Sequence, residues 1–154
     1  MPVTMKDVRA WLDAEEVDYL KAKRMGAAAV PFLMELAQGG DLALASKATY
    51  LASLIGSDQS AAVLEAAVAR NEPVLKVAAA SGMRNLPDEQ AEKIMELLRN
   101  DPDAGVRKVL VKSADRFKSP RMAERMQQMA DSDPEPFVRD LAASVVTRMK
   151  KRTK

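Results

Sequence analysis

The sequence repeats itself with a period of about 31 residues, and this period limits the possible folds more than any other feature. Four segments align when one basic residue of each is superimposed: SKATYLAS, LKVAAASG, VRKVLVKS and VRDLAASV. The aligned basic residues, at spacings of 29, 31 and 32, are Lys47, Lys76, Arg107 and Arg139. A second register, at spacings of 32, 30 and 31, runs through Leu36, Val68, Leu98 and Met129. Two independent registers with one period predict an array of stacked units.

Each unit is expected to contain two helices. Gly and Pro residues divide the chain into segments of about 10 to 15 residues, the usual length of a short helix. Between them apolar residues recur at spacings of three and four, as at Ile94, Leu97 and Leu98. Ala is abundant and β-branched alternation is absent, so the chain is predicted to be all-α. The predicted helices span residues 4–12, 14–25, 28–38, 42–55, 59–70, 74–85, 89–99, 104–117, 120–130 and 136–149.

Local signals support several of these boundaries. Ser119 before Pro120 predicts an N-cap followed by a first helical turn. Asp13 and Glu16 have the spacing of a capping box, and Gly26 suits the left-handed position that ends such a helix.

Three of the four aligned basic residues follow an acid by six positions. These acids are Asp41, Asp101 and Asp133, whereas the second repeat has Asn71 five positions before Lys76. We expect each acid to cap the second helix of its own or a neighbouring repeat, and each base to pair with an adjacent acid. These residues are therefore predicted to stabilise the array and not to form a catalytic set.

A period near 31, with two helices per unit, an acid in the turn and a base at the start of the second helix, resembles the HEAT repeat. More narrowly, it is similar to the short bacterial HEAT-like repeats related to those of phycobilisome lyases. The resemblance implies a right-handed α–α superhelix of about four helix pairs with an N-terminal helical cap. Within a single domain of residues 1–154, we expect a cap or half-repeat at 1–26, repeats at 27–149 and a basic tail at 150–154.

The composition excludes many enzyme classes. The chain has no Cys and no His, which removes thiolate and imidazole catalysis, disulfides and Cys/His metal sites. No nucleophile and base pair can be named, so we expect no catalytic residues, no cofactor and no small-molecule substrate. Charged residues near the start argue against a secretory signal, and the longest apolar stretch, 25–37, is too short to span a bilayer. These features predict a cytoplasmic protein without membrane association.

The resemblance implies that the second helices line a concave face that binds a partner protein. Positions one, five and eight after each aligned base would then be exposed: Ala48, Ala52 and Ile55; Val77, Ser81 and Arg84; Lys108, Lys112 and Asp115; Asp140, Ser144 and Thr147. This row changes from apolar to basic, which suits a partner with an apolar patch beside an acidic one. The candidate protein-binding residues are Lys76, Arg84, Lys108 and Lys112. The alternative is that Lys108 and Lys112 belong to an ordinary solvated face.

Charge is distributed unevenly along the chain, which leaves a second function open. Residues 1–102 have 11 basic and 15 acidic side chains, and residues 103–154 have 13 and 7. The basic half predicts nucleic-acid binding as an alternative, through Arg121, Arg125 and the tail, although the single Trp11 is far away in the sequence. A third reading, an accessory subunit of a lyase-type enzyme, depends on the repeat resemblance alone.

Two further patterns are read as structural. The pairs Asp101–Asp103 and Asp131–Asp133 lie in turns before helices, where the helix dipole favours acids, so no metal site is predicted. The stripe Met122, Met126 and Met129 is expected to lie in the core.

Overall fold

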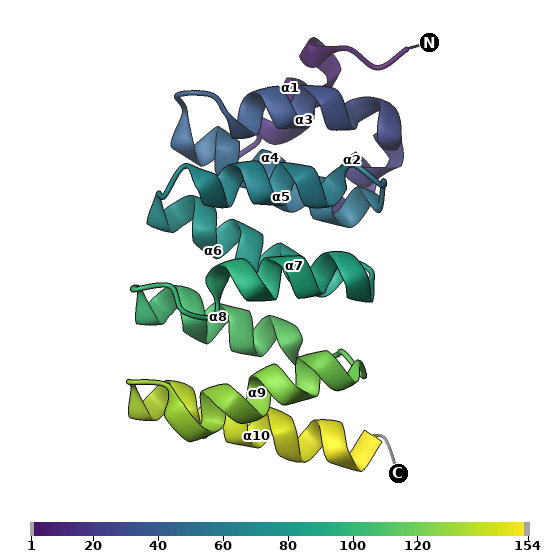
Figure 1. The fold of residues 1–154 in the computed structure, drawn as a ribbon. Coiled ribbons are helices and arrows are strands. Elements are labelled where there is room, and N and C mark those ends of the chain that lie inside the picture. The colour runs from purple at the N-terminus through teal and green to yellow at the C-terminus, as the bar shows by residue number, and fades with distance from the viewer. Residues whose placement is uncertain (1, 153–154) are drawn as a thin grey trace.

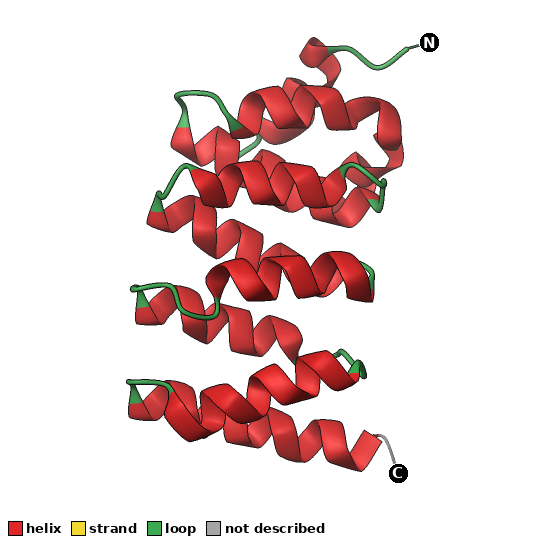
Figure 2. Cartoon of the chain, in the orientation of Figure 1, coloured by secondary structure: helices red, strands yellow, loops and turns green. Residues whose placement is uncertain are grey.

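The computed structural model describes residues 2–152, and in this range the chain forms helices and no strand (Figures 1 and 2). The α-helices are α1 (Met5–Leu12), α2 (Tyr19–Ala22), α3 (Val30–Ala37), α4 (Leu42–Ile55), α5 (Ser60–Ala69), α6 (Pro73–Gly82), α7 (Asp88–Leu98), α8 (Ala104–Ala114), α9 (Pro120–Ser132) and α10 (Pro136–Arg152). Short 3-10 helices are η1 (Lys23–Met25), η2 (Ala27–Ala29) and η3 (Met83–Asn85). The predicted all-α class is confirmed.

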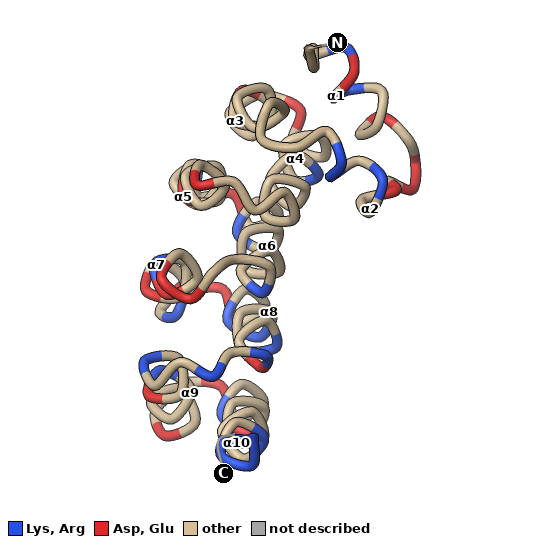
Figure 3. Tube along the Cα trace, turned by 90° about the vertical axis from the view of Figure 1, so that its right-hand side faces the viewer, with Lys and Arg blue, Asp and Glu red and all other residues tan. Residues whose placement is uncertain are grey.

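The helices form two layers of a stacked array. The first helices of the pairs, α3, α5, α7 and α9, make one column, and the second helices, α4, α6, α8 and α10, make the other (Figure 3). Each second helix packs against the next, and this layer is packed more closely than the layer of first helices. Closer packing is expected of the inner layer in a curved array, so the second helices take the place that the repeat pattern predicted for them.

The core is a continuous strip between the layers. Leucines and methionines from successive pairs are fully buried along it, among them Leu33, Leu64, Leu98 and Leu110. Met122, Met126 and Met129 are buried in the same cluster, as the sequence pattern indicated. Because every pair contributes to one strip, no pair closes a core of its own.

Most of the predicted helices are present, but the one predicted over residues 14–25 is wrong. Its capping box at Asp13 and Glu16 does not form; instead Asp18 accepts a hydrogen bond from the Lys21 backbone N–H and begins the single turn of α2. Gly26 does end the segment with a positive φ of 73°, but its ψ of −167° lies outside the left-handed helical region that was predicted for it. At the other terminus α10 continues to Arg152, so the expected basic tail is helical through residue 152, and residues 153–154 lie outside the described part.

In the N-terminal segment, residues 2–25, α1 packs against both α3 and α4, and α2 lies against α4 on the side away from the first helices (Figure 3). Val8 and Leu12 of α1 and Ala22 of α2 are fully buried there. As a result Ala48 and Ala52 of α4 are fully buried, which makes the prediction that they are exposed wrong. The sequence comparison treated all four second helices alike and could not show that a separate segment covers the first one.

Candidate functional site

The aligned basic residues form a ladder with the acids of the inter-helix turns. The Lys76 ammonium lies 2.7 Å from the Asp101 carboxylate, which belongs to the turn of the next repeat. One repeat further, Arg107 binds both oxygens of Asp133 through Nε and Nη2, at 2.9 and 3.1 Å. Each base thus reaches forward to the acid of the following turn. The predicted pairing of bases with adjacent acids is confirmed for these two repeats.

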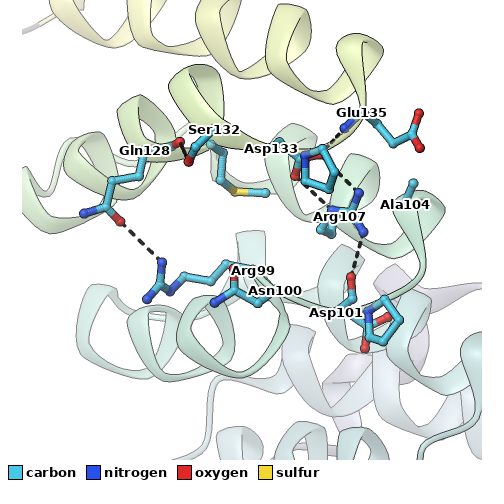
Figure 4. Close-up of a pocket in the computed structure, with 12 residues that line it drawn as sticks. Arg99, Asn100, Asp101, Ala104, Arg107, Gln128, Ser132, Asp133 and Glu135 are labelled. Carbon is cyan, nitrogen blue, oxygen red and sulfur yellow. Dashed lines mark hydrogen bonds and ion pairs between the residues drawn. The ribbon is translucent and has the colours of Figure 1, made fainter.

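Each base of the later repeats also holds its own turn. Arg107 Nη1 donates to the Asp101 carbonyl at 2.7 Å, and Arg139 Nη1 donates to the Asp133 carbonyl at 2.6 Å. Figure 4 shows Arg107 between these two turns, bonded to both of them. The ladder is therefore continuous from α6 to α10.

A pocket of about 350 Å³ opens beside this ladder, between the α7–α8 and α9–α10 turns (Figure 4). Among its lining side chains, Arg107 is paired with Asp133, and Arg99 donates to the amide oxygen of Gln128 at 3.3 Å. Hydrogen bonding to Asp133 raises the pKa of Arg107 above its ordinary value, although desolvation by burial acts in the opposite direction. Arg107 and Asp133 are therefore engaged in holding the turns.

The interface between the first two helix pairs is built differently, because the position six before Lys76, where the other repeats have the ladder acid, is not acidic. Arg70 stands six positions before Lys76 and reaches backward, donating from Nη1 to the Ala37 and Gly39 carbonyls at 2.9 and 2.6 Å. Lys47, without an acid to pair with, donates to the Leu12 and Ala14 carbonyls at 3.1 Å. The first ladder base therefore fastens the N-terminal segment to α4.

The exposed side of the later second helices is the candidate binding surface. We define the second-helix face by its exposed residues, which are Val74, Val77, Arg84, Lys108, Lys112, Phe137, Asp140, Ser144 and Thr147. Three of the four candidate residues, Arg84, Lys108 and Lys112, lie on it. Lys76 does not, because its side chain is buried against Asp101. The apolar end of the face is at Val74 and Val77, which are 44% and 37% exposed.

An open pocket of about 500 Å³ lies at one end of this face, near the C-terminal ends of α6, α8 and α10. We call it the basic pocket, and it is lined by Arg84, Lys112, Ser113, Asp115, Arg116 and Arg152. Sequence reasoning missed Arg116, although a signal was present: Arg84, Arg116 and Arg148 recur at spacings of 32 and 32 residues. That third register places one arginine per repeat at this end of the second helices.

One carboxylate accompanies these cations. Asp115 accepts hydrogen bonds from Arg148 Nε at 3.1 Å and from Arg152 Nη2 at 2.5 Å. Partial burial acts to raise the pKa of Asp115, but the hydrogen bonds from Arg148 and Arg152 outweigh it and the pKa is lowered. Asp115 is therefore ionised and already engaged at neutral pH.

The acid pairs of the turns have structural partners. Asp103 accepts from the Gly105 N–H at 2.7 Å and caps α8, while Asp101 and Asp133 belong to the ladder. Asp41 caps α4 through the Leu44 N–H, so the capping expected of it is confirmed. Across residues 2–152, no helix combines the length and apolar character needed to cross a membrane.

Comparison with known proteins gives one positive result. A family model described as HEAT repeats matches residues 69–147, which is just over half of the chain. No curated protein and no solved structure matches the sequence. The matched region contains α6 to α9 and most of α10, and it includes the continuous ladder and most of the second-helix face. The narrower likeness to the repeats of phycobilisome lyases stays a prediction.

Proposed function

The chain belongs to the HEAT-repeat family, and from this premise we propose that it is a non-catalytic scaffold that binds a partner protein along its second-helix face. The single observation on which the proposal rests is the contrast between the charged groups of the ladder and those of the second-helix face. Those of the ladder are buried and paired, whereas Lys108 and Lys112 are exposed. Among residues 2–152, no carboxylate lies within 4.0 Å of either ammonium.

The face suits a protein partner because it combines apolar and basic regions on neighbouring helices. Val74 and Val77 of α6 provide exposed apolar surface, and Lys108 and Lys112 of α8 provide positive charge beside it. Interfaces bury apolar area at their centre, while charge complementarity sets orientation and association rate. We propose the same division of roles here, with residues 1–26 capping the array that residues 27–149 form.

The test is affinity capture from the native lysate, with and without nuclease. The variant Lys108→Glu with Lys112→Glu reverses charge on the second-helix face. Lys93→Glu with Arg121→Glu makes the same charge change on exposed positions of the first helices α7 and α9, and serves as the matched control. We expect a discrete protein that survives nuclease, is lost with the first variant and is retained with the control.

Two results would contradict the proposal. If capture collapses with nuclease, the basic C-terminal half binds nucleic acid instead, and steep salt dependence would accompany that result. If both variants weaken capture equally, the net charge of the protein and not the second-helix face governs binding. Circular dichroism of each variant checks that the helices are intact.

A further inference from the structure

We propose that the basic pocket binds an acidic segment of the partner protein, held in an extended conformation across the C-terminal ends of α6 and α8 through its carboxylates. This inference rests on the proposed function and adds the chemical class of the bound segment. It follows from the charge balance of the pocket, from the fixed position of one arginine, and from the spacing of cations between repeats.

The charge balance of the pocket is strongly positive. Arg84, Lys112 and Arg116 line it, and among residues 2–152 no carboxylate lies within 4.0 Å of their side-chain nitrogens. The carboxylate in the wall, Asp115, is taken up by Arg148 and Arg152. Three cations that share one concave surface without counter-charges repel each other, and an anionic ligand relieves that repulsion.

Arg116 is held in place before any ligand arrives. Its Nη2 donates to the Leu86 carbonyl at 2.7 Å and its Nε donates to the Arg84 carbonyl. The guanidinium carbon lies 4.2 Å from the centre of the Phe117 ring, whose side chain is buried. Among residues 2–152, no hydrogen bond involves Nη1 of Arg116. A fixed guanidinium with unused donors loses little side-chain entropy when it binds a carboxylate.

The cations recur once per repeat, which defines the spacing of the ligand. Arg84 and Arg116 come from successive second-helix units, 32 residues apart, while Arg148 of the next unit is bonded to Asp115. Packed helices lie about 8–10 Å apart. An extended chain advances about 3.3 Å per residue, so carboxylates about three residues apart would meet cations of neighbouring repeats.

The chain itself shows how the second-helix layer holds a non-helical segment. The connection between α1 and α2 lies on the same side of α4 as α2 (Figure 3), and its acids Asp13 and Asp18 pair within the N-terminal segment, with Arg9 and Lys21. Lys47 fastens its start by donating to two backbone carbonyls. Among the described residues no such segment covers α6 and α8, and Arg84, Lys112 and Arg116 are open to one from another chain.

A protein segment fits this pocket better than a nucleic acid does. Binding of single strands relies on exposed aromatic rings on which bases stack. Phe117 is 1% exposed and faces the core, and Trp11 is on the N-terminal segment at the other end of the array. The pocket therefore has charge without a stacking platform.

The experiment measures binding of synthetic peptides to the full chain by fluorescence anisotropy. The probe is a labelled Ala/Ser peptide with Glu at every third position. Its controls are the same peptide with Gln for Glu, a peptide of equal composition with all Glu in one block, and an oligothymidylate of similar length. We expect the spaced Glu peptide to bind best. The Gln peptide should bind at least about tenfold more weakly, because its neutral side chains form no ion pairs with the cations of the pocket.

The variant Arg84→Glu with Lys112→Glu should lower affinity for the spaced peptide by about tenfold or more. Lys93→Glu with Arg121→Glu should leave it unchanged. Neither tested pocket residue holds the core, because Arg84 makes one side-chain bond, to the Ser81 carbonyl, and Lys112 makes none among the described residues. Failure of the spaced peptide to bind, equal loss in both variants, or tighter binding of the oligothymidylate would each overturn the inference.

The result is separable from the proposed function. If capture of a protein depends on Lys108 and Lys112 but the acidic peptide does not displace that protein, the scaffold function stands. The proposal that the bound segment is acidic is then wrong. If the spaced peptide binds while no captured protein depends on the second-helix face, the chemistry of the pocket stands and the proposed function fails.

Discussion

At the scale of single residues, the Arg107–Asp133 pair is the most consequential contact in the array. Both side chains are buried, and Arg107 also satisfies the Asp101 carbonyl. Arg107→Ala leaves a buried carboxylate without a counter-charge, which typically costs about 3–5 kcal/mol. Urea unfolding followed by circular dichroism measures this loss. The control Arg125→Ala removes a more exposed ion pair, with Glu96, and should lower stability less. An equal loss of stability in both variants would contradict the importance of the ladder.

Asp115 provides a residue-scale prediction about pH. Its pKa is lowered in the folded protein, so its pairing with Arg148 and Arg152 adds stability that is fully present above the ordinary carboxyl pKa of 3.8. That stability is lost as the pH falls through the lowered folded-state pKa. We therefore expect the stability difference between wild type and Asp115→Asn to be largest near neutral pH and to shrink in acid. A difference that is constant with pH would contradict the pairing.

The residues that sequence could predict are those that repeat. Lys76, Arg107 and their acids were identifiable because the same pair recurs with one period, and pairing follows from charge. The burial of Lys76, which places it outside the binding surface, was not predictable. The sequence does not show whether a lysine side chain reaches a neighbouring turn or points into solvent. Arg116 was overlooked since its register differs from that of the ladder, although its 32-residue spacing was visible.

At the scale of elements, the close approach of α6 to α4 leads to a packing prediction. A Cβ at Gly82 would lie 2.9 Å from both Cβ and Oγ of Ser53 and 3.3 Å from a Leu64 methyl carbon. Overpacking of this kind costs about 1–3 kcal/mol, more than the gain of at most about 1 kcal/mol from replacing Gly in a helix. Gly82→Ala should therefore lower the urea midpoint. Gly40→Ala, with open space at its Cβ, is the control and should leave the midpoint nearly unchanged.

The N-terminal segment is the element that sequence placed least well, and Lys47 tests its attachment. Lys47→Met removes two hydrogen bonds to the Leu12 and Ala14 carbonyls, each worth about 1–3 kcal/mol when the donor is charged. We expect the segment to detach locally, which the single Trp11 reports as a red-shifted emission, while the helical signal of α6 to α10 persists. An unchanged Trp11 spectrum would show that apolar packing of Val8 and Leu12 alone holds the segment.

At the scale of the whole molecule, the repeat period predicted the architecture, but it did not show that the bonding between neighbouring repeats differs along the chain. A stacked array is stabilised by each unit and by its contacts with its neighbours. From α6 to α10 these contacts include the buried ladder of Lys76, Asp101, Arg107, Asp133 and Arg139. Between α4 and α6 that ladder is absent, and Arg70 bonds to backbone carbonyls instead. Neighbouring pairs are therefore joined differently along the array, and the interface without the ladder is the one with the shortest spacing between aligned bases, 29 residues.

Native-state hydrogen exchange should resolve this difference, because cooperative units open at their weakest boundary. We expect α6 to α10 to exchange as one unit with a common opening free energy, and α1, α2 and η1 to open at a lower one. Arg107→Ala should then divide the C-terminal unit, reducing protection in α8 to α10 more than in α3 and α4, since the broken contact joins the α8 and α10 repeats directly. If protection instead falls uniformly along the chain, the array opens as one cooperative body, and the buried ladder adds stability without setting a boundary within it.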